Sequence, residues 1–169
     1  SFMKELKPDC LEDIIAGISL YRPGPMAEIP RYISGKRDPK SVEYIVPELE
    51  NILNVTYGVM VYQEQVMEIV RKLAGYSMGR SDLVRRAMSK KKHKVMEEER
   101  KNFIYGIEDE NGNIEVPGCL RNGISAEAAN KIFDSMMDFA SYAFNKSHAA
   151  AYAVIGFQTA YLMRYYPVE

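Results

Sequence analysis

The chain has 169 residues, of which 47% are hydrophobic and 27% are charged, and its formal net charge is −1. This length suits one domain with a buried core, and this composition excludes a disordered tail, which needs fewer apolar residues and more net charge. Cys10 and Cys119 lack the spacing of a disulfide framework or a metal site and suit a reducing cytosol. Since no run of about 18 apolar residues and no signal-peptide core occurs, we expect neither a secreted nor a membrane protein.

Helix signals dominate the first half of the chain. Asp9 and Glu12 have the spacing of a capping box ahead of an apolar helix. The prolines and glycine of residues 21–25 stop that helix, and a short helical piece over residues 27–34 is expected to end at Gly35.

The middle of the chain predicts three further helices. Residues 62–74 carry apolar side chains at the spacing of one helix face, with Gly75 as the C-terminal stop. Ser77 is expected to cap a helix over residues 79–89, and another helix follows over residues 94–105. The inner stripe of the 79–89 helix consists of Leu83, Val84, Ala87 and Met88.

The last third adds a hairpin and two helices. Asn111-Gly112 is a strong hairpin signal within residues 107–116. Ser125 is expected to cap a helix that ends near residue 142, and Ser147 to cap a last helix that ends near residue 165. Because the last helix is apolar on nearly every side, it is expected in the middle of the fold. The sequence predicts a mainly α domain of several helices with one small β-hairpin.

Charge is distributed unevenly along the chain. Residues 71–101 hold eleven Lys and Arg against four Asp and Glu, a local net charge of +7. A basic block in an otherwise acidic chain indicates a polyanion site, although a solvated charged helix gives the same pattern.

Phosphate binding is the best-supported chemistry of this block. Arg86 and Lys90 lie one helical turn apart, and Arg85 lies about 100° around the helix, so the three cations can reach different oxygens of a polyphosphate. Arginine suits this role because its guanidinium donates two parallel hydrogen bonds to a phosphate. The alternative is a surface ion pair between Asp82 and Arg86.

A second candidate site lies where the last helix starts. Asn145 and Lys146 stand among the free backbone N–H groups of that helix start, where an anion is favoured. His148 and Tyr152, one turn apart, offer rings that can stack on a base or a sugar. The alternative is an ordinary helix cap with aromatic packing behind it.

Groups for reaction chemistry are not recognisable in the sequence. There is no phosphate-binding loop with a following lysine, no Asp-x-Asp pair and no catalytic triad. Asp134 and Asp138 share a helix face but are expected to be solvated, and neither His93 nor His148 has a neighbouring metal ligand. The pattern indicates binding without catalysis.

Several motifs occur in an order that is typical of one family. They are Leu20-Tyr-Arg-Pro-Gly-Pro25, Tyr57-Gly-Val-Met-Val-Tyr-Gln-Glu-Gln65, Leu83-Val-Arg-Arg-Ala-Met88, Phe144-Asn-Lys-Ser-His-Ala-Ala-Ala-Tyr152, Gln158-Thr-Ala-Tyr-Leu162 and Tyr166-Pro167. With these motifs the chain resembles the α-helical fingers region of C-family bacterial replicative DNA polymerases, in the form of the DNA polymerase III alpha-subunit branch.

The resemblance implies a role in chromosome replication. In this family the catalytic aspartates and two Mg²⁺ ions belong to a palm domain that precedes the fingers, so we expect no metal here and no activity from the fingers alone. The resemblance places Arg85 and Arg86 at the triphosphate of the incoming dNTP. By extension we assign Lys90 and Lys146 to the triphosphate, and Asn145, His148 and Tyr152 to the nascent base pair or sugar.

The implied partners are dNTP, primer–template DNA, the palm of the same polypeptide and other replicase subunits, in the bacterial cytoplasm. The chain departs from the family pattern at Ser89 and in Ser141-Tyr-Ala-Phe144, where the family often has glycines. Residues 108–121 resemble no part of the family and are expected to form a surface insertion without a catalytic role. A freestanding helical module that tracks nucleic-acid phosphates and a purely structural helical domain are the alternative readings.

Overall fold

The computed structural model describes residues 2–90 and 93–167, and Lys91 and Lys92 of the basic block lie outside the described residues. Its helices are α1 (Phe2–Leu6), α2 (Leu11–Leu20), α3 (Ile29–Arg37), α4 (Glu50–Leu53), α5 (Gln63–Ala74), α6 (Met78–Ser89), α7 (His93–Tyr105), α8 (Gly118–Arg121), α9 (Ala126–Ala140) and α10 (Lys146–Tyr165). Two short strands, β1 (Ile107–Glu108) and β2 (Ile114–Val116), form an antiparallel hairpin. The expected mainly α fold with one small hairpin is confirmed.

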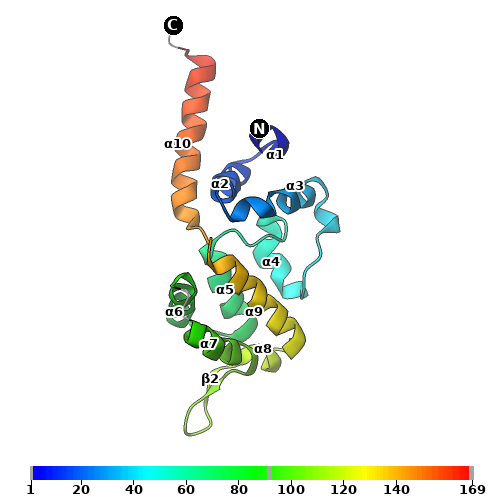
Figure 1. Cartoon of the computed structure of the whole chain (residues 1–169), viewed down its shortest axis with the longest axis vertical. Helices are drawn as coiled ribbons and strands as arrows, with labels where there is room; N and C mark the ends of the chain where they lie inside the picture. Colours follow the sequence, from blue (N-terminus) through cyan, green and yellow to red (C-terminus); the bar gives the residue numbers. More distant parts are fainter. Residues whose placement is uncertain (1, 91–92, 168–169) are drawn as a thin grey trace.

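The helices pack around two separate cores (Figure 1). We call the part built from α1, α2, α3 and the start of α10 the α2 lobe; its core includes Leu20, Tyr32 and Ala149. The part built from α4 to α9 is the α5 lobe, with Phe103 and Phe133 in its core. The chain passes between the lobes in extended segments that lead into α5 and α10, so both helices start at the boundary.

Local signals correctly predict three helix ends. Gly75 adopts φ 78°, and its N–H bonds to the carbonyl of Arg71, which ends α5. The Ser77 hydroxyl accepts the N–H of Arg80 at the start of α6, and the Ser125 hydroxyl accepts the N–H of Ala128 at the start of α9. In these three places a single residue satisfies the backbone groups that a helix end leaves open.

Two predicted helix boundaries in the first part of the chain are wrong. The N-cap of α2 is Cys10, not Asp9, and the Asp13 carboxylate accepts the backbone N–H of Asp9. Helix α3 continues through Gly35 to Arg37. A Cβ on Gly35 would lie 2.7 Å from the Cβ of Tyr57, so the glycine there allows close packing and does not end the helix.

The hairpin lies where expected, but the exposed segment is shorter than the predicted residues 108–121. Residues 108–115 are exposed, whereas Val116 and Cys119 belong to the core of the α5 lobe. At the base of the hairpin, a Cβ on Gly118 would lie 2.3 Å from the nitrogen of Gly106, and both glycines have positive φ. This close backbone crossing requires glycine and ties the base of the hairpin into the lobe.

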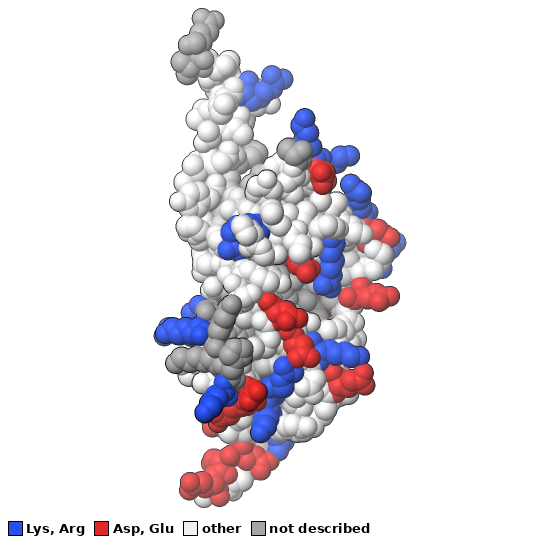
Figure 2. Space-filling model, viewed as in Figure 1, with Lys and Arg blue, Asp and Glu red and all other residues white. Residues whose placement is uncertain are grey.

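Helix α10 does not lie in the middle of the fold, and the prediction that it would is wrong. Ala149 and Ala153 pack against α2, whereas Phe157 and Tyr161 further along are 58% and 49% exposed. Figure 1 shows the helix projecting beyond the body, and Figure 2 shows little charge along it. Its apolar pattern calls for a partner that the described residues do not supply. None of the described helices has the length and apolar character needed to cross a membrane.

Candidate functional site

The candidate site lies where α5 and α10 begin side by side. Tyr62 and Phe144, the residues just before the two helices, form a parallel β-bridge. The N–H of Gln63 donates to the carbonyl of Phe144 at 2.9 Å, and the N–H of Phe144 donates to the carbonyl of Val61 at 3.3 Å. We call residues 61–65 and 142–148 the α5–α10 junction. Two helix N-termini meet there, and each brings partial positive charge.

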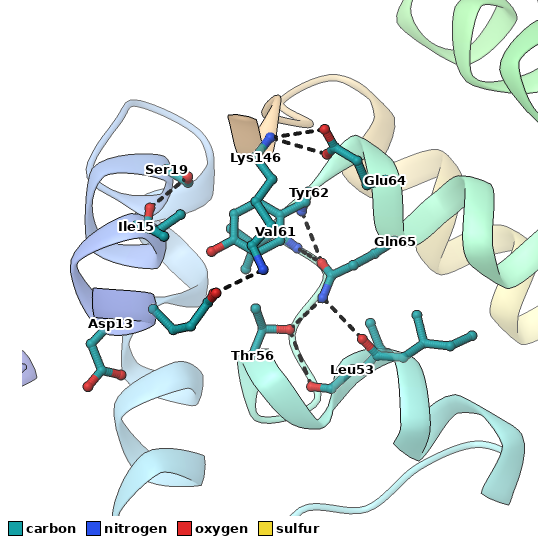
Figure 3. A network of polar contacts seen from close by, with 12 residues as sticks. Asp13, Ile15, Ser19, Leu53, Thr56, Val61, Tyr62, Glu64, Gln65 and Lys146 are labelled. Atoms are coloured by element: carbon teal, nitrogen blue, oxygen red, sulfur yellow. Dashed lines mark hydrogen bonds and ion pairs between the residues drawn. The ribbon is translucent and has the colours of Figure 1, made fainter. Parts of the chain in front are cut away.

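A buried amide holds the first part of the junction in place (Figure 3). The Gln65 side-chain oxygen accepts the backbone N–H groups of Val61 and Tyr62 at 2.8 and 3.0 Å, and its nitrogen donates to the Thr56 hydroxyl at 2.8 Å. Gln65 is 5% exposed, so these bonds are shielded from water. They fix the direction in which the chain enters α5.

Glu64 occupies the N-terminus of α10. Both of its carboxylate oxygens accept the backbone N–H of Lys146 at 3.2 Å, and Oε1 also accepts the side-chain amide of Asn145. The other side of that amide accepts the N–H of His148 at 2.9 Å, so Asn145 and not Ser147 caps the helix. The protein therefore supplies its own anion at the position where the sequence suggested a phosphate.

The charge of Lys146 is already paired. Its ammonium lies 3.0 Å from Glu12 of α2 and 5.3 Å from the centre of the Tyr62 ring. Burial raises the pKa of Tyr62, and the nearby Glu12 and Glu64 raise it further, so the ring stays neutral beneath the ammonium. Lys146 thus joins α10 to α2, and a contact with phosphate requires the pair with Glu12 to open.

The two arginines of α6 share one carboxylate but point to different places. Arg85 donates through Nε and Nη2 to Asp82 Oδ1 at 2.9 and 2.7 Å, and Arg86 lies 2.7 Å from Asp82 Oδ2. The hydrogen bond from Arg85 lowers the pKa of Asp82, which stays ionised. With Lys90 as a third cation, the side chains of Asp82, Arg85, Arg86 and Lys90 together carry a net charge of +2.

Of the three α6 cations described above, Arg85 is the one that bonds to the α5–α10 junction. Its Nη1 donates to Gln63 Oε1 at 3.0 Å, and Gln63 Nε2 donates in turn to the carbonyl of Ala143 at 3.4 Å. Arg86 and Lys90 are exposed and line a hollow between α6 and α7, together with Leu83. Leu83 is 64% exposed, so its expected place on the inner stripe is wrong.

An aromatic ladder runs from the junction along α10. The rings of Phe144 and His148 lie 5.6 Å apart, and those of His148 and Tyr152 lie 4.8 Å apart. Tyr152 is 58% exposed, so the far end of the ladder is open to a ligand. The structure thus places His148 and Tyr152 together, as the sequence suggested.

Arg22 completes this region, and the search for site residues in the sequence missed it. Its guanidinium carbon lies 4.3 Å from the centre of the Phe144 ring, and its Nη2 donates to the carbonyl of Tyr142 at 2.8 Å. Burial lowers the pKa of Arg22. Arg22 ties the end of α2 to the segment before α10, a contact across 120 residues that local spacing cannot indicate.

One group of possible metal ligands lies away from the junction. Among the described residues, ligand atoms of Asp9, Cys10 and Asp13 lie within 4.8 Å of one another. The ammonium of Lys36 lies 2.9 Å from Asp9 and 2.6 Å from Asp13, so this cluster already holds a cation of the protein itself.

Comparisons with known proteins place the chain in a family. The model of the bacterial DNA polymerase III alpha subunit finger domain matches residues 1–111. The DNA polymerase III alpha subunits of Halalkalibacterium halodurans and Bacillus subtilis share 47% sequence identity with the chain, over 98% and 99% of its length respectively. The alpha subunit of Chlamydia pneumoniae shares 50% identity over 98% of the chain. The chain spans only 14%, 14% and 12% of the lengths of these relatives. It belongs to the finger-domain family of bacterial DNA polymerase III alpha subunits.

Proposed function

We propose that the chain is the fingers part of a replicative DNA polymerase and contacts the triphosphate of the incoming dNTP and the nascent base pair during template-directed nucleotidyl transfer. One observation carries the proposal. Through Gln63, the Arg85 guanidinium on the basic helix is linked to the segment from which the aromatic ladder starts. A phosphate-binding cation and flat ring surfaces thus border one junction, as a nucleotide requires.

The charge of α6 suits a triphosphate. Arg85 is oriented by Asp82 and Gln63, while Arg86, which also pairs with Asp82, and Lys90 are exposed to solvent. Phosphoryl transfer is catalysed largely by positioning and by neutralising the charge that develops on the leaving pyrophosphate. In this proposal the α6 cations stabilise that charge, and His148 and Tyr152 provide surfaces for the base or sugar.

The residues at the junction do not fit a Mg²⁺ ion. Mg²⁺ prefers carboxylate and water oxygens, and the carboxylates of Glu64 in the junction and of Asp82 on the neighbouring α6 are committed to other partners. Asp82 is bound by two arginines, and Glu64 by the N-terminus of α10. We therefore assign the catalytic metal ions to the palm of a longer polypeptide, and we propose that this chain alone does not catalyse. Primer–template DNA is contacted by this chain together with the palm, and other replicase subunits bind through the remainder of that polypeptide.

Removing the exposed cations of α6 tests this function. In the complete polymerase polypeptide that carries this chain, we expect Arg86→Ala combined with Lys90→Ala to raise the KM for dNTP about tenfold at saturating primer–template, because each lost phosphate contact weakens triphosphate binding. Since both side chains are exposed, the thermal midpoint should stay within about 8 °C of the parent value. Steady-state incorporation kinetics and thermal unfolding measure the two quantities.

The same variant distinguishes the proposal from a module that only tracks nucleic-acid phosphates. A tracking module predicts an unchanged KM for dNTP, together with weaker DNA binding and a salt dependence reduced by about one ion per lost contact. Lys131→Ala on α9, which removes an exposed cation outside the basic block that pairs with Glu127, is the control and should leave both constants unchanged.

A further inference from the structure

Gln63 bonds to two segments that carry different parts of the proposed site. Its side-chain oxygen accepts from Arg85 of α6 at 3.0 Å, and its side-chain nitrogen donates to the Ala143 carbonyl at 3.4 Å. Its backbone N–H donates to the neighbouring Phe144 carbonyl at 2.9 Å. Among the residues that the structure describes, Gln63 hydrogen-bonds both to a cation of α6 and to the segment before α10.

We propose that Gln63 is a positioning residue that sets the Arg85 guanidinium relative to the aromatic ladder of α10. This inference rests on the proposed function. It adds that the Gln63 amide couples the triphosphate contact of Arg85 to the base-pair surface of α10. A displacement of either one therefore displaces the other. Asp82 cannot provide this coupling because it lies on the same helix as Arg85 and fixes the guanidinium only within α6.

The chemistry at position 63 requires an amide. Arg85 needs an acceptor and the Ala143 carbonyl needs a donor, and a glutamine side chain offers one of each. A carboxylate would keep the contact with Arg85 but turn an oxygen toward the Ala143 carbonyl, and an apolar side chain would lose both bonds.

The surroundings strengthen these bonds. Gln63 and Arg85 line a small hollow whose other walls are Val66, Met88, Ala140 and Ala143, which are buried or partly buried. Hydrogen bonds in such apolar surroundings are stronger and better defined in direction than those in water. The guanidinium is therefore held in a defined place before a nucleotide arrives, which is how preorganised groups lower a barrier.

A double-mutant cycle in the complete polymerase polypeptide tests the inference. We expect Gln63→Met, which keeps the length of the side chain, to lower kcat/KM for dNTP incorporation about tenfold, because small displacements of a catalytic contact are costly. In an Arg85→Ala background the same change should have less than about a twofold effect, since the residue to be positioned is gone. Glu68→Ala, at an exposed position on the same helix, is the control and should match the parent.

The outcomes separate the inference from the proposed function. Wild-type kinetics for Gln63→Met beside a slow Arg85→Ala enzyme would overturn the positioning role alone, as would equal effects of Gln63→Met in both backgrounds. Wild-type kinetics for Arg85→Ala would overturn the proposed function. If Gln63→Met lowers the thermal midpoint, Gln63→Glu, which retains the acceptor for Arg85 but loses the donor to Ala143, replaces it in the cycle. Its kcat/KM is expected to fall by about the same factor as that of Gln63→Met.

Discussion

Arg85→Ala in the complete polymerase should slow dNTP incorporation about 100-fold, the loss typical of removing one donor to a developing negative charge. Arg85 is the α6 cation that the structure orients from two sides, by Asp82 and by Gln63. Single-turnover incorporation at saturating dNTP measures the effect, because it separates the chemical step from product release. Arg85→Lys should recover part of the rate, since it restores the charge but not the planar fork.

A structural explanation for such a loss can be tested with the same protein. Arg85→Ala leaves Asp82 paired with Arg86, so the fold should survive the change. Lys72→Ala, which removes a cation from the exposed side of α5, should incorporate at the parent rate. An Arg85→Ala enzyme within threefold of the parent rate would show that this guanidinium does not act on the triphosphate.

Asp13→Asn should destabilise the chain by about 3 kcal/mol, the lower end of the usual cost of breaking a buried ion pair, because Lys36 then keeps its pair with the exposed Asp9 but loses the buried one. The Asp13 side chain is 1% exposed and lies 2.6 Å from Lys36, whose side chain is 12% exposed. Its carboxylate also accepts from the Tyr32 hydroxyl and from the N–H of Asp9. Urea unfolding at neutral pH gives the free energy of unfolding for both proteins.

The pH dependence of stability tests the same carboxylate. Burial alone raises the pKa of Asp13, but the hydrogen bonds from Lys36 and Asp9 outweigh it and lower the pKa to about 2. Because an unfolded aspartate has a pKa of about 3.9, the stabilisation is complete above that pH and is lost as the pH falls toward 2. Asp13→Asn should remove this part of the acid sensitivity.

The exposed pair of Glu68 and Lys72 is the matched control for this prediction. Its N···O distance of 2.7 Å is close to that of Asp13 and Lys36, but its side chains are 42% and 50% exposed. Glu68→Gln should change the free energy of unfolding by less than about 0.5 kcal/mol, because water screens the pair. Equal effects of Asp13→Asn and Glu68→Gln would contradict the role given to burial.

Features with a local cause were predictable from the sequence. Ser77, Gly75 and Ser125 each act on backbone groups within four residues, so their types and positions were enough to place helix ends. The Asn111-Gly112 hairpin follows for the same reason. The family also followed from motifs in the sequence, and the comparisons confirm it.

Features that depend on distant residues were not predictable in this way. Glu64 accepts the N–H of Lys146 at the start of α10 from 82 positions away in the sequence. Arg22 donates to the carbonyl of Tyr142 from 120 positions away. Lys146 looked like a free cation because its partner, Glu12, lies at the other end of the chain. An apolar pattern shows that α10 needs a partner, but not whether these 169 residues contain it.

The most direct test is a structure of the complete polymerase with primer–template DNA and a non-hydrolysable dNTP. The account predicts phosphate oxygens within about 3 Å of the Arg85 guanidinium, further phosphate contacts from Arg86 or Lys90, and the nascent base pair or sugar against His148 and Tyr152. A triphosphate bound away from α6, with Arg85 still paired only with residues of this chain, would contradict it.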